Sequence, residues 1–422
     1  MDIYKICGGK SLKGEVSISG AKNAALPIIV ASLLADGETV LKNIPYLVDV
    51  KTILEVMEYL GVESELNHEK NTLKIRVNRL TNAEIPYDLV KTMRASIYVM
   101  GPLLARLGEV DISLPGGCAI GERPIDIHLA GFESLGAQID IEHGYIKARA
   151  KRLKGAKFIM RNVSVGATAN IIMSSVLAKG ETILENCAIE PDIVDLGNFL
   201  IKMGAQIDGL GTDRLIIRGV KSLKPVTYSI IPDRIESGTY LLAGAITRGD
   251  VKITRMRPDH ITSLLNILSE MGFQIEQGTN WIRIRPSDTL NGAVIRTLPY
   301  PGFPTDLQAP ILSLMCTIPG ISVIIETIFD KRFTHIGELR RMGADITTEG
   351  NVIIVKGVEE LTSATVMMSD LRAGAALILA ALSSEGETEI RRIYHSDRGY
   401  EKLTEKLSSL GADIIREKGG KP

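Results

Sequence analysis

The sequence predicts an α/β protein of six repeated β-α-β-α-β-β units, expected to form two lobes of three with helices inside and sheets facing outwards. Two series of glycines that each recur about every 70 residues carry this prediction. The first series is Gly61, Gly136, Gly204, Gly272, Gly343 and Gly411. The second is Gly37, Gly108, Gly180, Gly249, Gly320 and Gly386.

Each glycine is expected to end a helix and begin a strand. Glycine just after a helix adopts the left-handed conformation that stops the helix. In the first series the next residues alternate apolar and polar, as in LGAQIDI and MGADITT, which is typical of a strand with one buried face. The glycines of the second series also stand between an apolar helix and a strand.

The first helix of each unit is expected to be buried because it is apolar nearly all round. These helices are predicted within residues 24–35, 95–105, 170–178, 238–246, 309–316 and 373–382. Three such helices can share one interior, which favours two lobes of three units.

Composition excludes several classes of protein. With 49 Lys and Arg against 50 Asp and Glu, the net charge is −1, which argues against binding to nucleic acid. No apolar run reaches the roughly 20 residues of a membrane span, and Met1–Gly14 has no apolar signal core. The four cysteines are far apart and form no metal-binding or disulfide pattern. We therefore expect a cytoplasmic protein; its oligomeric state does not follow from these data.

Arginine recurs in several of the loops that precede the predicted helices. A single arginine at such a position more often caps a helix or forms a surface ion pair. Recurrence in both loop sets favours an anionic substrate, because guanidinium groups bind phosphate and carboxylate in a bidentate manner. The arginines concerned are Arg94, Arg123, Arg234, Arg332, Arg372 and Arg398.

Other loop residues carry two interpretations each. Cys118, in a glycine-rich loop beside Arg123, is either a reactive thiol or an inert one. Lys22 either binds phosphate or is a solvated residue at a helix start, and Asp306 is either a helix N-cap or a general base. His128 and His395 are candidate acid–base groups or simply hydrogen-bonded. Cys7, Cys187 and Cys316 lie in apolar stretches and are expected in the core.

The sequence resembles the enolpyruvyl transferases that act on UDP-N-acetylglucosamine, over essentially its whole length. The motifs that carry the resemblance are GAKNAALP, PYDLVKTMRASI, LPGGCAIGERPIDIH, SVGAT, PDRIESGT, FPTDLQAP, MGAD, DLRAGAAL and IYHSDRGYEKL. The resemblance implies an inside-out α/β barrel with the active site between two lobes. One lobe would span 21–229, and the other 1–20 plus 230–422, completed by the N-terminal strand.

The resemblance also implies a reaction and its residues. The enolpyruvyl group of phosphoenolpyruvate would pass to the 3′-hydroxyl of UDP-N-acetylglucosamine through a tetrahedral ketal, with no metal or organic cofactor. Cys118, on a loop expected to act as a lid, would protonate C3, and Asp306 would take the hydroxyl proton. Phosphoenolpyruvate would be held by Lys22, Asn23, Arg123 and Arg398. The sugar nucleotide would contact Arg94, Arg123, Pro124, Ile125, Asp126, Ile127, Asp306 and Ile328, with Arg332, Asp370 and Arg372 in support.

The sequence leaves three alternatives open. The first is 3-phosphoshikimate 1-carboxyvinyltransferase, which shares the fold but lacks the PGGC loop. The second is a ring-like, non-catalytic scaffold around a polymer, and the third is a catalytically silent paralogue. One departure is noted: Asn162 stands where some members of the family have lysine, which puts a charged nucleotide contact in doubt.

Overall fold

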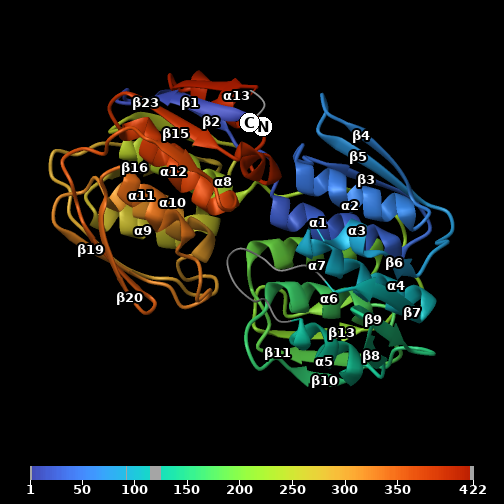
Figure 1. The fold of residues 1–422 in the computed structure, drawn as a ribbon. Coiled ribbons are helices and arrows are strands. Elements are labelled where there is room, and N and C mark those ends of the chain that lie inside the picture. Colours follow the sequence, from blue (N-terminus) through green and yellow to red (C-terminus); the bar gives the residue numbers. More distant parts are fainter. Residues whose placement is uncertain (1, 92, 115–124, 419–422) are drawn as a thin grey trace. The chain divides into compact units, whose positions relative to one another are not determined.

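The computed structural model describes residues 2–91, 93–114 and 125–418, which divide into two compact units (Figure 1). The first unit consists of 2–19 and 232–418, and the second of 20–114 and 125–231. Among the described residues, the chain passes between the units at 19–20 and again at 231–232.

The second unit contains three repeats. The first comprises α1 (Lys22–Ala31), η1 (Ser32–Leu34), β3 (Gly37–Lys42), α2 (Val48–Tyr59), β4 (Glu63–Asn67) and β5 (Thr72–Val77). The next comprises β6 (Glu84–Ile85), α3 (Tyr87–Val90), η2 (Arg94–Val99), α4 (Met100–Leu107), β7 (Glu109–Ser113), α5 (Asp126–Ser134), β8 (Gln138–Glu142) and β9 (Tyr145–Arg149). The last comprises β10 (Lys157–Ile159), α6 (Val165–Ser175), β11 (Glu181–Glu185), α7 (Pro191–Met203), β12 (Gln206–Asp208) and β13 (Arg214–Arg218), and β14 (Thr227–Ser229) follows.

The first unit begins with β1 (Ile3–Cys7) and β2 (Lys13–Ser17). It continues with α8 (Arg234–Ile246), β15 (Asp250–Thr254), η3 (Pro258–Ile261), α9 (Thr262–Glu270), β16 (Gln274–Gln277) and β17 (Trp281–Arg285). The next repeat is β18 (Val294–Arg296), η4 (Thr305–Leu307), α10 (Gln308–Met315), β19 (Ile321–Ile325), α11 (Thr334–Arg341), β20 (Asp345–Glu349) and β21 (Val352–Lys356). The last is β22 (Thr365–Met367), α12 (Leu371–Ser383), β23 (Glu387–Arg391), η5 (Ile393–Arg398), α13 (Leu403–Ser409) and β24 (Asp413–Glu417).

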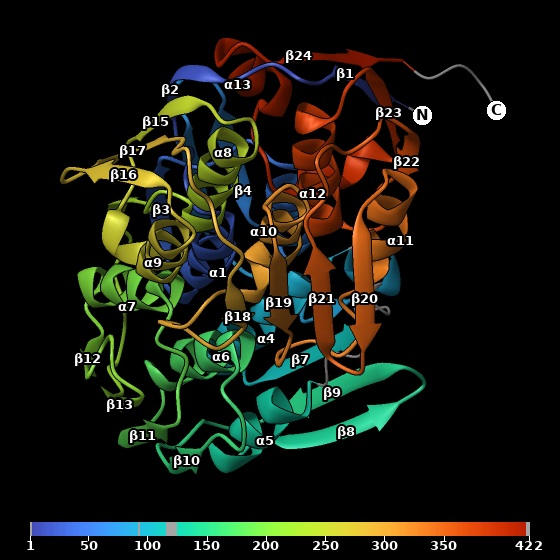
Figure 2. The ribbon, with the colours of Figure 1, turned by 90° about the vertical axis from the view of Figure 1, so that its left-hand side faces the viewer.

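The six sheets of the described chain share one topology, which confirms the predicted repeat. In each, an edge strand pairs in parallel with a second strand, and two antiparallel strands follow. Figure 2 shows this arrangement for the order β18-β19-β21-β20. The first helices are buried as expected: every residue of α10 is buried, whereas β5 buries alternate residues.

Two edge strands are exchanged between repeats. β2 precedes α1 in the chain but pairs with β15, which follows α8. Conversely, β14 precedes α8 but pairs with β3, which follows α1. β1 completes the last sheet by pairing with both β23 and β24, which is the N-terminal strand crossing that the resemblance implied.

The glycine prediction is confirmed with one exception. All six glycines of the first series have positive φ, as do five of the second. Gly249 is different: a Cβ there would lie 2.2 Å from the Leu12 carbonyl oxygen, and the left-handed residue is Arg248 instead. Glycine is needed here for a close backbone approach to the exchanged N-terminal segment.

The helix predicted at 95–105 is interrupted. Residues Arg94–Val99 form a 3-10 helix, and the α-helix begins only at Met100. Pro102 explains the break, because its ring would clash with a carbonyl four residues earlier in a continuous α-helix, whereas it is tolerated in the first turn. No helix of the described residues is both long enough and apolar enough to traverse a bilayer.

Candidate active site

Asp306 is held between two buried arginines in the first unit. It lies in η4, which follows Pro304 and leads into α10. Its Oδ1 accepts a hydrogen bond from Arg332 Nη2 at 2.9 Å, and its Oδ2 accepts one from Arg372 Nη2 at 2.8 Å. The arginine side chains are 4% and 6% exposed, whereas that of Asp306 is 26% exposed. The N-cap interpretation is wrong, because neither η4 nor α10 has a side-chain cap.

Asp370 is the N-cap of α12, the helix that carries Arg372. Its carboxylate accepts hydrogen bonds from the backbone N–H groups of Arg372 at 2.9 Å and Ala373 at 3.1 Å, which starts α12. Burial acts to raise the pKa of Asp370, but the Ala373 N–H and the charge of Arg332 outweigh it, and the pKa is lowered. Burial likewise opposes the charged form of Arg372, yet Asp306 raises the pKa of this guanidinium.

Arg398 belongs to the same unit, at the end of η5. The neighbouring His395 has its pKa lowered, first by burial and then by the charge of Arg398, while Asp370 opposes the shift. Asp397 points elsewhere, since it binds Arg416 through two hydrogen bonds of 2.8 and 3.0 Å.

Lys22 begins α1 in the second unit, directly before Asn23. Its Nζ lies 3.4 Å from Oδ2 of Asp49, in the first turn of α2, and the two side chains are 14% and 5% exposed. Lys22 is therefore not a solvated lysine at a helix start. Asp49 was missed by the sequence reasoning, although an acidic residue in the first turn of the second helix was a visible signal.

Asp126 begins α5, with Ile125 at its N-cap position. The Asp126 carboxylate forms an ion pair with Arg161. Ile127 is buried and belongs to the core of the second unit, so its side chain contributes to packing.

His128 is a hydrogen-bonded core residue. It is 6% exposed, and its Nδ1 lies 3.0 Å from the side-chain nitrogen of Asn170. Asn170 also binds the Ile97 carbonyl and the Gly101 N–H, so this contact ties three segments together.

The structure does not describe the side chains of four predicted site residues. Cys118, Arg123 and Pro124 lie outside the described residues, and Arg94 is described only by its backbone, where η2 begins.

Cys187 and Cys316 do not supply a reactive thiol. Burial raises the pKa of both Cys187 and Cys316 to about 12, so both remain protonated at neutral pH. The expectation that Cys7 lies in the core is wrong, because this residue is only half-buried in β1. Cys187 and Cys316 are core residues, as the sequence predicted.

The described candidates thus form two groups, one in each unit. Asp306, Ile328, Arg332, Asp370, Arg372 and Arg398 belong to the first unit, and Lys22, Asn23, Ile125, Asp126 and Ile127 to the second. Each group combines carboxylates with cationic side chains. This chemistry suits binding of a small, multiply anionic substrate.

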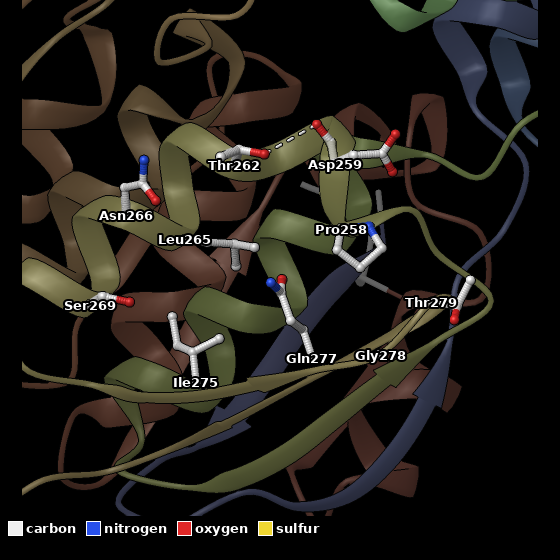
Figure 3. Close-up of a pocket in the computed structure, with 10 residues that line it drawn as sticks. All are labelled: Pro258, Asp259, Thr262, Leu265, Asn266, Ser269, Ile275, Gln277, Gly278 and Thr279. Carbon is white, nitrogen blue, oxygen red and sulfur yellow. Dashed lines mark hydrogen bonds between the residues drawn. The ribbon is translucent and has the colours of Figure 1, made fainter.

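A separate pocket of the first unit contains none of these residues. It has a volume of about 670 Å³ and lies between α9 and the β16–β17 hairpin (Figure 3). Its one charged lining residue, Asp259, is held by two hydrogen bonds from Arg257. Because the lining lacks cations, we do not assign the anionic substrate to it. The lining residues are Pro258, Asp259, Thr262, Leu265, Asn266, Ser269, Ile275, Gln277, Gly278 and Thr279.

Comparisons with known proteins agree on one family. The family model of EPSP synthase (3-phosphoshikimate 1-carboxyvinyltransferase) matches residues 6–407. The chain is 52% identical to a UDP-N-acetylglucosamine 1-carboxyvinyltransferase of Geotalea uraniireducens, over 99% of both chains. It is 54% identical to UDP-N-acetylglucosamine 1-carboxyvinyltransferase 1 of Caldanaerobacter subterraneus, over 96% of this chain and 97% of the relative.

Solved structures share the fold. The enolpyruvyl transferase NikO from Streptomyces tendae superimposes with a TM-score of 0.90 at 25% identity, over 99% of both chains. EPSP synthase from Acinetobacter baumannii gives a TM-score of 0.77 at 19% identity, over 99% of this chain and 100% of the other. The second likeness concerns the fold alone.

Proposed function

Because this chain belongs to the UDP-N-acetylglucosamine 1-carboxyvinyltransferases of the enolpyruvyl transferase family, we propose that it moves the enolpyruvyl group of phosphoenolpyruvate onto the 3′-hydroxyl of UDP-N-acetylglucosamine. Phosphate is the second product. Identity of 51–54% to relatives of that name along nearly the whole chain is the observation that carries the proposal. The reaction is the first committed step of peptidoglycan synthesis and takes place in the cytoplasm.

The proposed donor site is cationic. Phosphoenolpyruvate carries a phosphate and a carboxylate, so its binding needs several fixed positive charges. Lys22, Arg123 and Arg398 supply them, with Asn23 beside Lys22. The partly buried side chain of Lys22, which is 14% exposed, supports this assignment, because its ammonium is positioned by Asp49 rather than left mobile in water.

Asp306 is proposed to accept the proton of the 3′-hydroxyl as the sugar oxygen bonds to C2. Cys118 donates a proton to C3 in the same addition, which gives the ketal. Loss of phosphate and of a C3 proton then restores the double bond. The two guanidinium groups on Asp306 support this role, because they hold its carboxylate in one orientation while part of it stays open to solvent. The negative carboxylate also stabilises positive charge that develops at C2.

The enzyme is proposed to have two lobes, 21–229 and 1–20 plus 230–422, with bounds close to those of the two compact units. Arg94, the run from Arg123 to Ile127, and Ile328 contact the sugar nucleotide.

The alternative acceptor, shikimate 3-phosphate, receives less support. The solved EPSP synthases are 19% identical to this chain, whereas the transferases named for UDP-N-acetylglucosamine are 51–54% identical. A DNA-encircling scaffold is disfavoured by the net charge of −1.

The test is phosphate release from phosphoenolpyruvate by the purified full chain. We expect release with UDP-N-acetylglucosamine, together with a nucleotide product that carries the enolpyruvyl group. We expect no release with shikimate 3-phosphate or without an acceptor. Release with shikimate 3-phosphate alone would replace the proposal by the alternative.

A further inference from the structure

Glu326 is a buried carboxylate to which the proposed chemistry assigns no role. It follows β19 directly and is 1% exposed. Its Oε1 accepts hydrogen bonds from the Thr297 hydroxyl at 2.8 Å, the Ile328 N–H at 2.8 Å and the Phe329 N–H at 3.2 Å. Its Oε2 accepts one from the Thr305 hydroxyl at 2.9 Å. One side chain therefore joins the η4 segment to the loop after β19.

The contact with Thr305 leads directly to Asp306. The Thr305 hydroxyl donates to Glu326 and accepts a hydrogen bond from Arg332 Nη1 at 2.8 Å. The other terminal nitrogen of the same guanidinium, Nη2, donates to Asp306 at 2.9 Å. Arg332 also lies over the Phe329 ring, 5.3 Å from its centroid, and Glu326 holds the Phe329 backbone. Both neighbours that flank this guanidinium are thus anchored on Glu326.

The position of Arg332 depends on these anchors. Its side chain is 4% exposed, and its Nε is buried without a hydrogen-bond partner in the described part of the chain. The guanidinium is therefore oriented by its two terminal nitrogens, one on Thr305 and one on Asp306. Removing the Thr305 contact leaves Arg332 free to rotate away from the carboxylate.

We propose that Glu326 is a positioning residue for Asp306, acting through Thr305 and Arg332; this inference rests on the proposed function. Glu326 does not touch the reacting atoms. It sets the orientation of the guanidinium that fixes one oxygen of the Asp306 carboxylate. Such a role changes the rate of proton acceptance more than the binding of phosphoenolpyruvate, whose proposed ligands lie elsewhere.

Four hydrogen-bond donors surround the Glu326 carboxylate, and they determine which contacts a glutamine at this position would keep or lose. A glutamine carbonyl can replace Oε1 and keep its three donors, so the turn at Ile328 and Phe329 survives. The amide NH₂ then faces the Thr305 hydroxyl, which loses its acceptor. Glu326→Gln therefore disturbs the link to Arg332 with little effect on the loop.

The experiment compares wild type with Glu326→Gln, Thr305→Val, the double variant, and Glu338→Gln as a control. Glu338, in α11, is a partly buried carboxylate that accepts one backbone hydrogen bond, from Met367 at 3.1 Å. We expect kcat to fall on the order of tenfold in each single variant, with the KM for phosphoenolpyruvate unchanged. The double variant should be no slower than the slower single variant, because both act on one link. The control should keep the wild-type kcat.

An unchanged kcat in Glu326→Gln, or independent effects that multiply in the double variant, would overturn the inference. A wild type that fails to release phosphate refutes the proposed function instead. A measurement without substrates then still tests the positioning role. Hydrogen exchange of the Arg332 Nε–H, identified by its loss in Arg332→Lys, should be on the order of tenfold faster in Glu326→Gln. Equal exchange rates would show that Glu326 does not restrain this guanidinium.

Discussion

Replacing Asp306 by alanine should lower the free energy of unfolding by more than the loss of an exposed ion pair would. The change leaves the guanidinium groups of Arg332 and Arg372, 4% and 6% exposed, without their shared counter-ion. Breaking a buried ion pair costs about 3–5 kcal/mol. The Asp306 side chain is itself 26% exposed, and each arginine keeps one further acceptor, Thr305 or Tyr400. We therefore expect a loss of about 2–4 kcal/mol in the free energy of unfolding.

The assay is urea unfolding followed by the fluorescence of Trp281. It is the one tryptophan of the chain, and it lies in β17, so it reports on the unit that contains Asp306. Asp259→Ala is the matched control, because it removes an ion pair with Arg257 whose two side chains are 61% and 53% exposed. The control should lose less than about 1 kcal/mol.

The reasoning fails if Asp306→Ala and Asp259→Ala unfold at the same urea concentration with equal slopes. That outcome would mean that water or rearranged neighbours compensate both arginines fully. A change in slope alone would indicate an altered unfolded state rather than the lost ion pair.

Further predictions concern the proposed acid, the proposed phosphate ligand and a buried carboxyl group. Cys118→Ala should nearly abolish turnover and sensitivity to thiol alkylation, with Cys118→Asp retaining activity, and a normal rate in Cys118→Ala would remove the acid assignment. Lys22→Ala should raise the KM for phosphoenolpyruvate tenfold or more, on the order expected for a lost charged contact, and an unchanged KM would exclude Lys22 from binding. Burial raises the pKa of Asp195 to about 6, although the Tyr228 hydroxyl opposes the shift. The raised pKa stabilises the second unit below about pH 4, and this contribution, at most about 3 kcal/mol, is lost as the pH rises through 6. In wild type, the opening free energy of α7 measured by hydrogen exchange should therefore fall as the pH rises from about 4 to about 6. Asp195→Asn should remove this pH dependence, and an unchanged pH dependence in the variant would contradict the prediction.

Much of the fold followed from local patterns. Gly61 and its counterparts end helices because only glycine enters the left-handed region at low cost, and this requirement acts within a few residues. The apolar helices had to be buried whatever surrounds them, as α10 is. The interruption before α4 was also a local effect of Pro102, although helical periodicity concealed it.

The site was less predictable because its contacts join distant segments. Asp306 is 66 residues from Arg372, and its N-cap interpretation was reasonable until that contact was known. Glu326 stood in the sequence as one acidic residue among many. Its role rests on donors from Thr297, Thr305 and the following turn, and spacing alone does not bring these together.

The sequence by itself determined the repeat of six units, the buried helices and the residue types that an anionic substrate requires. Only the tertiary structure decided that β2 pairs with β15 and β14 with β3, because both edge strands carry equivalent local patterns and either pairing satisfies them. The same holds for the carboxylates: whether Asp306 caps a helix or binds two arginines depends on which side chains packing brings within hydrogen-bond distance. Local conformational preference acts over a few residues, whereas these choices depend on contacts across much longer stretches of the chain.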